Sequence, residues 1–455
     1  MSAMCQAKED GMAKSIAISD HFTYSKLIRY CLPSVTMMVF TSLYTIVDGF
    51  FVSNLAGEKA FTALNLIWPI IGILSSFGFM IGTGGTALVS KTLGEGNNQK
   101  ACEYFTMLIV FEVLLGLSVS ALTIVFIEPL ARLCGATDDL LQDCYLYAIP
   151  LLACQAVCFM SNSYQSFLVA AGKPKFGLII SLACGLLNMV LDYVFIAVFH
   201  LGILGASLAT ALNWVLGGLI PTFWFWKHQE NDLHFVKFKW KFKAIWQSCF
   251  NGMSEMVTNL SLSFILLLYN LVLMNIAGSQ GVVVYGVVQY LGFLFAAVFL
   301  GYTLAVAPCI GYQYGAQNHE ELQNLFHKSL ILIAISSVAV VLIADGLAYE
   351  LASLFVSYSP ELMEMTHYAV QLYSLGFLVA GFNIFASGFF TALNNGPVSA
   401  LLSLMRTFVF QALAVLVLPY FFGLTGVWMA NFIAEILSLG LSAFFLLKLK
   451  KRYGY

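Results

Sequence analysis

The feature that most restricts this chain is the grouping of its apolar residues into runs of 18 or more with few charges between them. An apolar run of about 20 residues is long enough for an α-helix to cross the hydrocarbon core of a bilayer. Only 10% of the residues are Asp, Glu, Lys or Arg and 60% are apolar, whereas an average soluble domain carries roughly 25% charged residues. Because this composition cannot cover a water-soluble surface, most of the surface must face lipid.

The apolar runs predict an all-α, polytopic membrane protein of about 12 transmembrane helices in two six-helix bundles. The helices are expected near residues 30–54, 60–90, 101–127, 140–170, 175–199, 203–226, 244–276, 282–312, 322–349, 362–392, 398–421 and 425–447. The predicted domains are an N-terminal tail at 1–29, bundles at 30–226 and 244–447, a polar linker at 227–243 and a C-terminal tail at 448–455.

The basic residues predict the orientation of these helices. With the N-terminus inside, only Lys59 and Arg132 of the 21 Lys and Arg residues fall on the outer side. The positive-inside rule therefore places both termini in the cytoplasm of a multi-pass protein of the cell membrane. The first 25 residues carry charges without an apolar core, so no cleavable signal peptide is expected.

The second half of the sequence repeats the first at an offset of 221 residues. This shift aligns Asn97 with Asn318, Gly94 with Gly315, and Gly202 with Gly423. Six helices return a chain to its starting side, so the halves should be related by a pseudo-twofold axis along the membrane normal. Such a repeat predicts two bundles that rock around a central cleft, where a substrate would bind. A repeat kept only for packing is the alternative.

Two isolated aspartates lie within the predicted spans, at Asp48 and Asp192. A charge at the centre of a span costs roughly 2.5–3.5 kcal/mol on insertion scales, so each needs a reason to be there. Tyr44 precedes Asp48 by one helical turn, and Asn188 precedes Asp192 by one turn. Carboxylates with nearby oxygens can carry a proton or hold sodium, and the sequence does not separate these. A purely structural role is the alternative.

Other charged residues in the spans have less defined roles. Glu255 lies near the start of its helix, where an acid can favour the helix dipole, so capping and function are equally supported. The sequence does not indicate a role for Glu112 or Glu435. Aromatic faces attract organic cations, and the spacing of several polar and aromatic residues predicts that they line the substrate cleft. This set is Tyr285, Gln289, Phe293, Tyr302, Arg406 and Glu255.

Several classes of function are disfavoured. Nucleic-acid binding needs a basic face, and a chain with a net charge of −2 is not expected to have one. The ten cysteines include no CxxC pair, so no cofactor and no metal other than a coupling ion is expected, and whether Cys134 and Cys144 pair stays open. The expected partners are small amphipathic organic compounds and the lipid bilayer, and the chain is expected to be a monomer.

Four segments carry a resemblance to a known family: VDGFFVSNLAG at 47–57, GTGGTALVSKTLGEGN at 82–97, AAGKPKFGLIISLACGLLNMVLDYVF at 170–195 and GMSEMVTNLSLSF at 252–264. Together they resemble the multidrug and toxic compound extrusion (MATE) family, in particular the MepA-like group of its DinF-type branch. The resemblance implies two six-helix bundles around a V-shaped cleft, and export of amphipathic, often cationic drugs against protons or sodium. It implies a coupling-cation site at Asp48, Asn188, Asp192 and Thr210, with Tyr44 and Asn162 close by.

One departure from the family pattern bears on the site. Another branch uses acids midway along the seventh helix and in the tenth, whereas the seventh helix here reads LSFILLLYN at 262–270. Glu255 lies too early to be the equivalent, so coupling is expected in the first bundle.

Three alternatives fit the sequence less well than an exporter. A flippase for a lipid-linked oligosaccharide would need several basic residues in the cleft, and Arg406 is the only intramembrane candidate. A membrane enzyme would need a nucleophile with a base or a metal cluster, and no such constellation is present. The major facilitator architecture also has two six-helix halves, but its basic loop after the second helix is replaced by LGEGNNQK at 93–100.

Overall fold

The computed structural model describes residues 16–51, 58–134, 136–229, 232–356 and 359–455, and every regular element within these ranges is a helix. The first half contains α2 (Tyr24–Phe51), α3 (Glu58–Gly94), α4 (Asn98–Val125), α5 (Ile127–Leu133), α6 (Leu141–Ala153), α7 (Gln155–Ala170), α8 (Pro174–Asp192), the π-helix η2 (Tyr193–Val198) and α9 (Ile203–Lys227). The second half contains α10 (Phe242–Asn251), α11 (Met253–Gly315), α12 (His319–Gly346), α13 (Ala348–Val356), α14 (Pro360–Ser374), α15 (Phe377–Ala392), α16 (Gly396–Leu404), the π-helix η3 (Met405–Val409) and α17 (Phe410–Tyr453).

The described helices account for the predicted number of spans. Nine segments are long and apolar enough to cross a membrane, and two bent pairs of helices raise the number to 11. One of the nine, Gly396–Tyr453, is 58 residues long, about 87 Å at 1.5 Å per residue, nearly three times the hydrocarbon thickness. It is interrupted at Gly423, where the backbone is non-helical. Counting it as two spans gives twelve among the described residues.

Two of the predicted helices, over 140–170 and 362–392, are not continuous. The first consists of α6 and α7, bent by 58° at Cys154, and the second of α14 and α15, bent by 47° next to Gly376. At both bends backbone N–H groups bond to carbonyls only three residues back, as from Cys154 to Leu151 and from Gly376 to Tyr373. Such tight turns redirect a helix without leaving backbone groups unpaired, and they give no signal in an apolar run.

The predicted repeat is visible in the backbone geometry of the two halves. Asn97 and Asn318 both cap a helix, each accepting a 3.1 Å hydrogen bond from the backbone N–H three residues ahead. Gly202 and Gly423 adopt nearly the same conformation, with φ of 55° and 56° and ψ of −133° and −135°. An L side chain rarely adopts this positive-φ conformation. Equivalent glycines and caps at the predicted offset indicate two copies of one structural unit.

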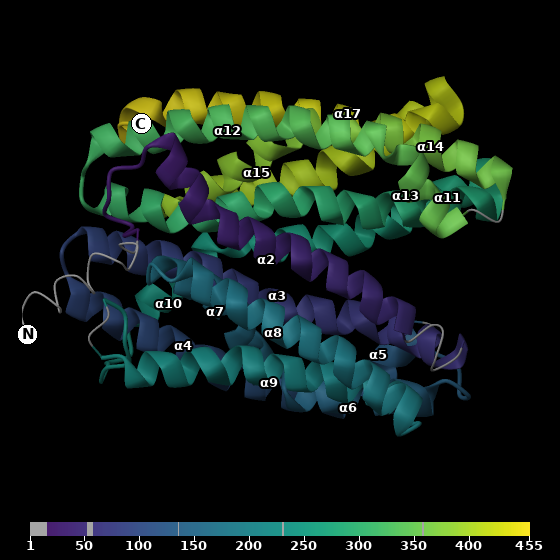
Figure 1. Cartoon of the computed structure of the whole chain (residues 1–455), viewed down its shortest axis with the longest axis horizontal. Coiled ribbons are helices and arrows are strands. Elements are labelled where there is room, and N and C mark those ends of the chain that lie inside the picture. The colour runs from purple at the N-terminus through teal and green to yellow at the C-terminus, as the bar shows by residue number, and fades with distance from the viewer. Residues whose placement is uncertain (1–15, 52–57, 135, 230–231, 357–358) are drawn as a thin grey trace, which may run out of the picture.

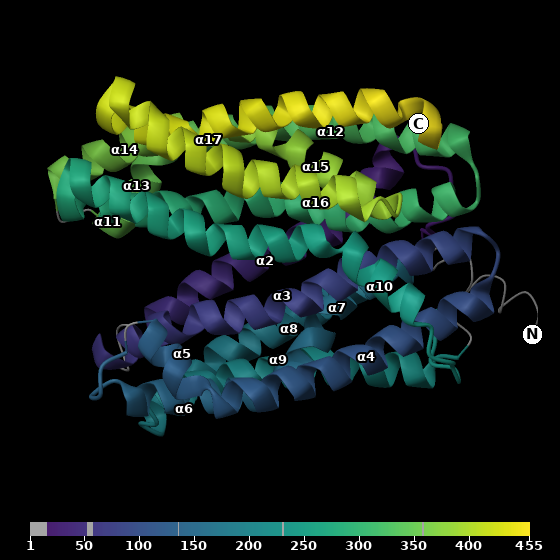
Figure 2. The ribbon, with the colours of Figure 1, turned by 180° about the vertical axis from the view of Figure 1, so that it is seen from behind.

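The helices form two lobes, as Figures 1 and 2 show. The first lobe (α2 to α9) and the second lobe (α11 to α17) lie side by side, with α2 along their boundary and α10 packed against α3 of the first lobe. The start of α2 and the C-terminal end of α17 lie at one end of the molecule, here called the termini end. There Gln323 of α12 donates to the Gly454 carbonyl at 3.1 Å and Gln313 of α11 donates to the Ile18 carbonyl at 3.4 Å.

At the termini end the backbones of the two lobes come into direct contact, through glycine. A Cβ atom on Gly94 of α3 would overlap the Tyr312 carbonyl, and one on Gly315 of α11 would overlap the Lys91 carbonyl. These two glycines are equivalent under the sequence repeat, so the close approach lies near the axis that relates the lobes. Backbone contact at this position requires residues without a side chain.

Candidate functional site

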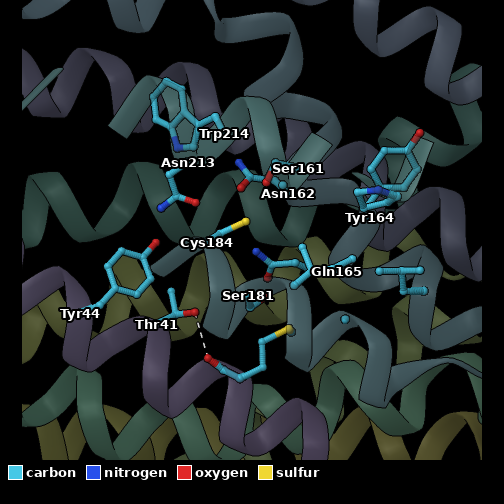
Figure 3. Close-up of a pocket in the computed structure, with 16 residues that line it drawn as sticks. Thr41, Tyr44, Ser161, Asn162, Tyr164, Gln165, Ser181, Cys184, Asn213 and Trp214 are labelled. Atoms are coloured by element: carbon cyan, nitrogen blue, oxygen red, sulfur yellow. Dashed lines mark hydrogen bonds between the residues drawn. The ribbon is translucent and has the colours of Figure 1, made fainter. Parts of the chain in front are cut away.

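A polar cavity lies inside the first lobe (Figure 3). Its volume is about 70 Å³ and it is partly open to the surroundings, which is room for an ion with a few water molecules but less than a whole drug-sized compound occupies. Helices α2, α7, α8 and α9 form its wall. The lining residues are Met37, Thr41, Tyr44, Ser161, Asn162, Tyr164, Gln165, Leu168, Gly177, Ile180, Ser181, Cys184, Asn213, Trp214, Gly217 and Pro221.

Helix α7 supplies the most polar part of this wall. Residues 161–166 read SNSYQS, six polar or phenolic residues in the middle of a span. Asn162 and Gln165 face the cavity, and Asn162 also donates to the Ser75 carbonyl at 3.3 Å. Tyr164 shares a 2.8 Å hydrogen bond with Thr222. Only Asn162 of this run was predicted, although so many polar residues in an apolar span are themselves a signal of a polar chamber.

The side chain of Asp48 lies outside the part of the chain that the structure describes, and only its backbone position in α2 is known. Tyr44, one turn earlier, is half-buried and lines the cavity. Ring atoms of Tyr44 approach Gly185 of α8. Since α2 and α8 both start at the termini end and run in the same direction, Asp48 is level with the turn of α8 that contains Asn188.

The other predicted coupling residues pack behind the cavity. Asp192 is fully buried and Asn188 is 2% exposed, one turn apart on α8, and Thr210 is buried on the adjacent α9. Within the described residues the Asn188 amide nitrogen has no hydrogen-bond partner. The structure thus puts Tyr44 and Asn162 on the cavity wall, whereas Asn188, Asp192 and Thr210 belong to the α8–α9 packing beside it.

Both π-helical segments coincide with charged residues in the spans. The π-helix η2 begins directly after Asp192, and η3 contains Arg406. Insertions of this kind widen a helix locally and are frequent at functional sites. A pattern of apolar runs does not reveal them, because the residues of both segments are mostly apolar, like those of the α-helices around them.

In the second lobe, Arg406 belongs to a buried polar network. Its Nε atom lies 3.9 Å from the carboxylate of Glu435, which accepts a 2.7 Å hydrogen bond from Asn383. Asn383 in turn accepts from Ser442 at 2.9 Å. Glu255, in the first turn of α11, is within electrostatic reach of the Arg406 guanidinium. Arg406 and Glu255 are therefore brought within electrostatic reach of each other, and the Arg406 Nη1 atom has no hydrogen-bond partner among the described residues.

The aromatic residues predicted for the cleft are not gathered in one place. Tyr285 is 1% exposed and stacks on Tyr269 in the core of the second lobe, with ring centroids 4.2 Å apart. Tyr302 donates to Ser329 at 2.9 Å. Gln289 is half-buried, and Phe293 is exposed on α11. None of them lines the cavity of the first lobe.

The structure also bears on the cysteines and on possible metal ligands. Cys134 and Cys144 are both free thiols. Across the described ranges no three His, Cys, Asp or Glu side chains are close enough to hold a metal ion together.

A polytopic helical protein built from two repeated lobes, with a polar cavity inside the membrane region, has the architecture of a secondary transporter. The chain belongs to the MatE family, whose model matches residues 33–194 and again residues 256–417. The double match agrees with the repeat seen in the backbone. Among curated proteins, the multidrug export protein MepA of Staphylococcus haemolyticus (strain JCSC1435) is 24% identical over 431 residues, covering 94% of each chain. MepA of Staphylococcus aureus (strain MSSA476) is 24% identical over 417 residues, covering 91% of each.

Solved structures share the fold. A crystal structure of MATE in complex with MaL6 has a TM-score of 0.88 at 23% identity, covering 95% of this chain and 98% of that one. A MOP superfamily transporter from Pyrococcus furiosus, described as having a binding pocket of reverse polarity, has a TM-score of 0.86 at 22% identity, covering 94% and 97%. The two-lobed helical fold predicted from sequence is thereby confirmed.

Proposed function

We propose that the protein exports amphipathic organic compounds, cations among them, from the cytoplasm in exchange for protons or sodium ions. The observation that carries this proposal is the polar cavity of the first lobe, which adjoins the helix turns that hold Asp48, Asn188 and Asp192. The MepA relatives, which carry the name multidrug export protein, support the same substrate class.

The chemistry of the site suits exchange. Asp192 is fully buried beside Asn188, and a buried carboxylate is stable only when a proton, a cation or a strong donor balances its charge. Loss of that proton or cation would change the charge next to the cavity wall formed by Tyr44 and Asn162. A cationic group of an exported compound at this wall and the coupling ion would then compete for the same negative charge, which is the differential interaction that exchange requires.

In this proposal the two lobes rock about the axis that relates them and expose the cavity to each side in turn. The excess of Lys and Arg at the termini end supports placing that end, with both termini, in the cytoplasm. The functional unit is a single chain, because each chain contains both lobes.

The first test is Asp48→Asn, measured as efflux of ethidium from energised cells. The amide keeps the size of the side chain but cannot change charge, so we expect efflux at least tenfold slower, near the level of cells without the protein. Asp138→Asn is the matched control, since Asp138 is 86% exposed at the far end of the first lobe and should leave efflux unchanged. Unimpaired efflux by a properly inserted Asp48→Asn protein would remove the coupling assignment.

An assay in proteoliposomes shows which ion gradient drives transport. An imposed proton gradient and an imposed sodium gradient are compared for their ability to drive uptake of the same dye. Stimulation by one gradient identifies the ion, and stimulation by neither contradicts exchange.

A lipid-linked oligosaccharide flippase is less well supported. A pyrophosphate group needs several unpaired cationic side chains. Arg406 lies 3.9 Å from the Glu435 carboxylate and within electrostatic reach of Glu255, so two acids already counter its charge.

A further inference from the structure

The linker between the lobes is fixed to the first lobe. Leu233 is fully buried, and Phe235 stacks on Phe105 of α4 with ring centroids 5.3 Å apart. The Val236 N–H donates to the Thr106 hydroxyl at 3.1 Å, and the Lys241 ammonium forms a 2.7 Å ion pair with Glu103. These contacts leave the rest of the linker with a defined outer side.

That outer side alternates lysines with large aromatic residues and continues onto α10. We call it the Lys–aromatic strip: Lys237, Lys239, Trp240, Phe242, Lys243 and Trp246. Phe242 is 76% exposed and Trp246 is 69% exposed. The three strip lysines are exposed and form no ion pair with any other described residue. This surface combines exposed positive charges with exposed aromatic rings. A partner suited to it would offer both negative charge and apolar area.

The strip lies beside the first turns of a helix that is long and apolar enough to cross a membrane. Its anchoring contacts are on Glu103 and Thr106, in the second and third turns of α4, which starts at Asn98. Trp226, in the last turn of α9, is 63% exposed beside the same linker. Trp and Lys together are typical of the boundary between hydrocarbon and headgroups. The linker belongs to the termini end, where Figure 1 shows α9 ending and α10 beginning.

We propose that the Lys–aromatic strip is a binding surface for the headgroups of anionic phospholipids in the leaflet at the termini end. Its lysines pair with the lipid phosphates and acidic headgroups, while Trp240, Phe242 and Trp246 occupy the glycerol and upper acyl region. The complementarity is local, because the whole chain has a net charge of −2 whereas the strip carries three lysines and no acid. Lipid binding at the strip is separate from the transport function and requires no transported substrate.

Basic residues near an anionic surface each strengthen binding by roughly fivefold. Replacing Lys237, Lys239 and Lys243 together by Gln should therefore weaken binding of phosphatidylglycerol by roughly a hundredfold. Lys241 and Glu103 are left intact in this variant, so the linker stays attached to α4. Binding is measured on the full chain in detergent, by titration with phosphatidylglycerol or phosphatidylcholine and detection of bound lipid by native mass spectrometry.

The matched control replaces Lys448, Lys450 and Lys451 by Gln. These three lysines are also exposed, at the end of α17 and at the same end of the molecule, but exposed aromatic residues do not alternate with them. We expect this control to lose less than fivefold, and we expect phosphatidylcholine binding to change little in either variant. Equal losses in the two triple variants, or no preference of the unaltered chain for phosphatidylglycerol, would overturn the proposal.

A second variant separates the contribution of the aromatic rings from that of the lysine charges. Trp240→Ala combined with Trp246→Ala should weaken binding of both lipids by a similar factor, because it removes rings and no charge. Raising the salt concentration should weaken phosphatidylglycerol binding to the unaltered chain but have little effect on the triple variant of the strip. A salt effect of the same size in both proteins would also contradict the proposed surface.

Discussion

Glu112 shows at the scale of one residue what a charge inside a span requires. Its side chain is fully buried in α4, and one carboxylate oxygen accepts a 2.7 Å hydrogen bond from Ser163. The other oxygen has no partner among the described residues. Ser163 comes from the same polar run of α7 whose neighbours Asn162 and Tyr164 line the cavity, so Glu112 supports the cavity wall from behind.

We expect Glu112→Gln to be tolerated and Glu112→Ala to be destabilising. The amide keeps the acceptor for Ser163 and fills the same space, whereas alanine leaves a cavity and should cost about 2–3 kcal/mol. Thermal unfolding of both variants in detergent tests this, with a midpoint several degrees lower only for the alanine variant. Equal destabilisation by both changes would mean that the negative charge itself is needed.

How much of the site the sequence could predict depends on the type of signal. Asp48 and Asp192 stand out because a lone charge among apolar residues is costly, and Tyr44 and Asn162, which the family resemblance implied, do line the cavity. The aromatic set was harder, since core residues such as Tyr285 and exposed residues such as Phe293 are equally apolar. In a membrane, the outward face of a helix carries no polar pattern, so sequence alone does not tell which face meets a neighbour.

At the scale of elements, the segment before α2 is tied to the second lobe by Glu321 of α12. The carboxylate, itself buried, accepts from the Phe22 N–H at 2.9 Å and contacts His21 Nδ1 at 2.5 Å. Asn324 and Lys328 donate to the Phe22 carbonyl at 3.0 and 2.6 Å. These bonds connect the start of the first lobe to the second lobe at the termini end, where the lobes would have to part in a transport cycle.

Glu321→Ala should therefore favour separation of the lobes at the termini end. Cys31 of α2 and Cys309 of α11 are both buried beside Tyr30 and report on this boundary. In a chain whose other cysteines are replaced by serine, we expect maleimide to label these two thiols several-fold faster after Glu321→Ala. His21→Ala is the control with little expected effect, because the His21 side chain is 69% exposed and exposed pairs contribute little. Unchanged labelling in the Glu321 variant would show that the segment does not hold the lobes together.

At the scale of the whole molecule, the repeat explains why the closed end is so tightly packed. Gly94 and Gly315 are equivalent residues that each meet a carbonyl of the opposite lobe, so one glycine position of the repeated unit serves twice near the axis. The repeat and the number of spans were predictable, because both leave regular signals over hundreds of residues. The bends at Cys154 and Gly376 and the π-helices were not, because they change the path of a helix without changing which residues are apolar.

The close approach can be tested with one substitution and its matched control. In Gly315→Leu the new side chain would overlap the Lys91 carbonyl, so the lobes should be unable to close at the termini end. Leucine favours an α-helix by roughly 1 kcal/mol over glycine, so α11 itself should stay intact. Gly440→Leu places the same side chain on an exposed helical glycine of α17 with open space around it and should leave the lobes closed.

Distances between spin labels on α4 and α12 at the termini end, measured by pulsed electron spin resonance, distinguish these outcomes. The Gly315 variant should lengthen the distance and slow dye efflux, because a transporter held open on one side cannot complete its cycle. The Gly440 variant should reproduce the unaltered chain in both measurements. An unchanged distance in the Gly315 variant would show that the added side chain is accommodated without parting the lobes, and would place their hinge somewhere other than this glycine contact.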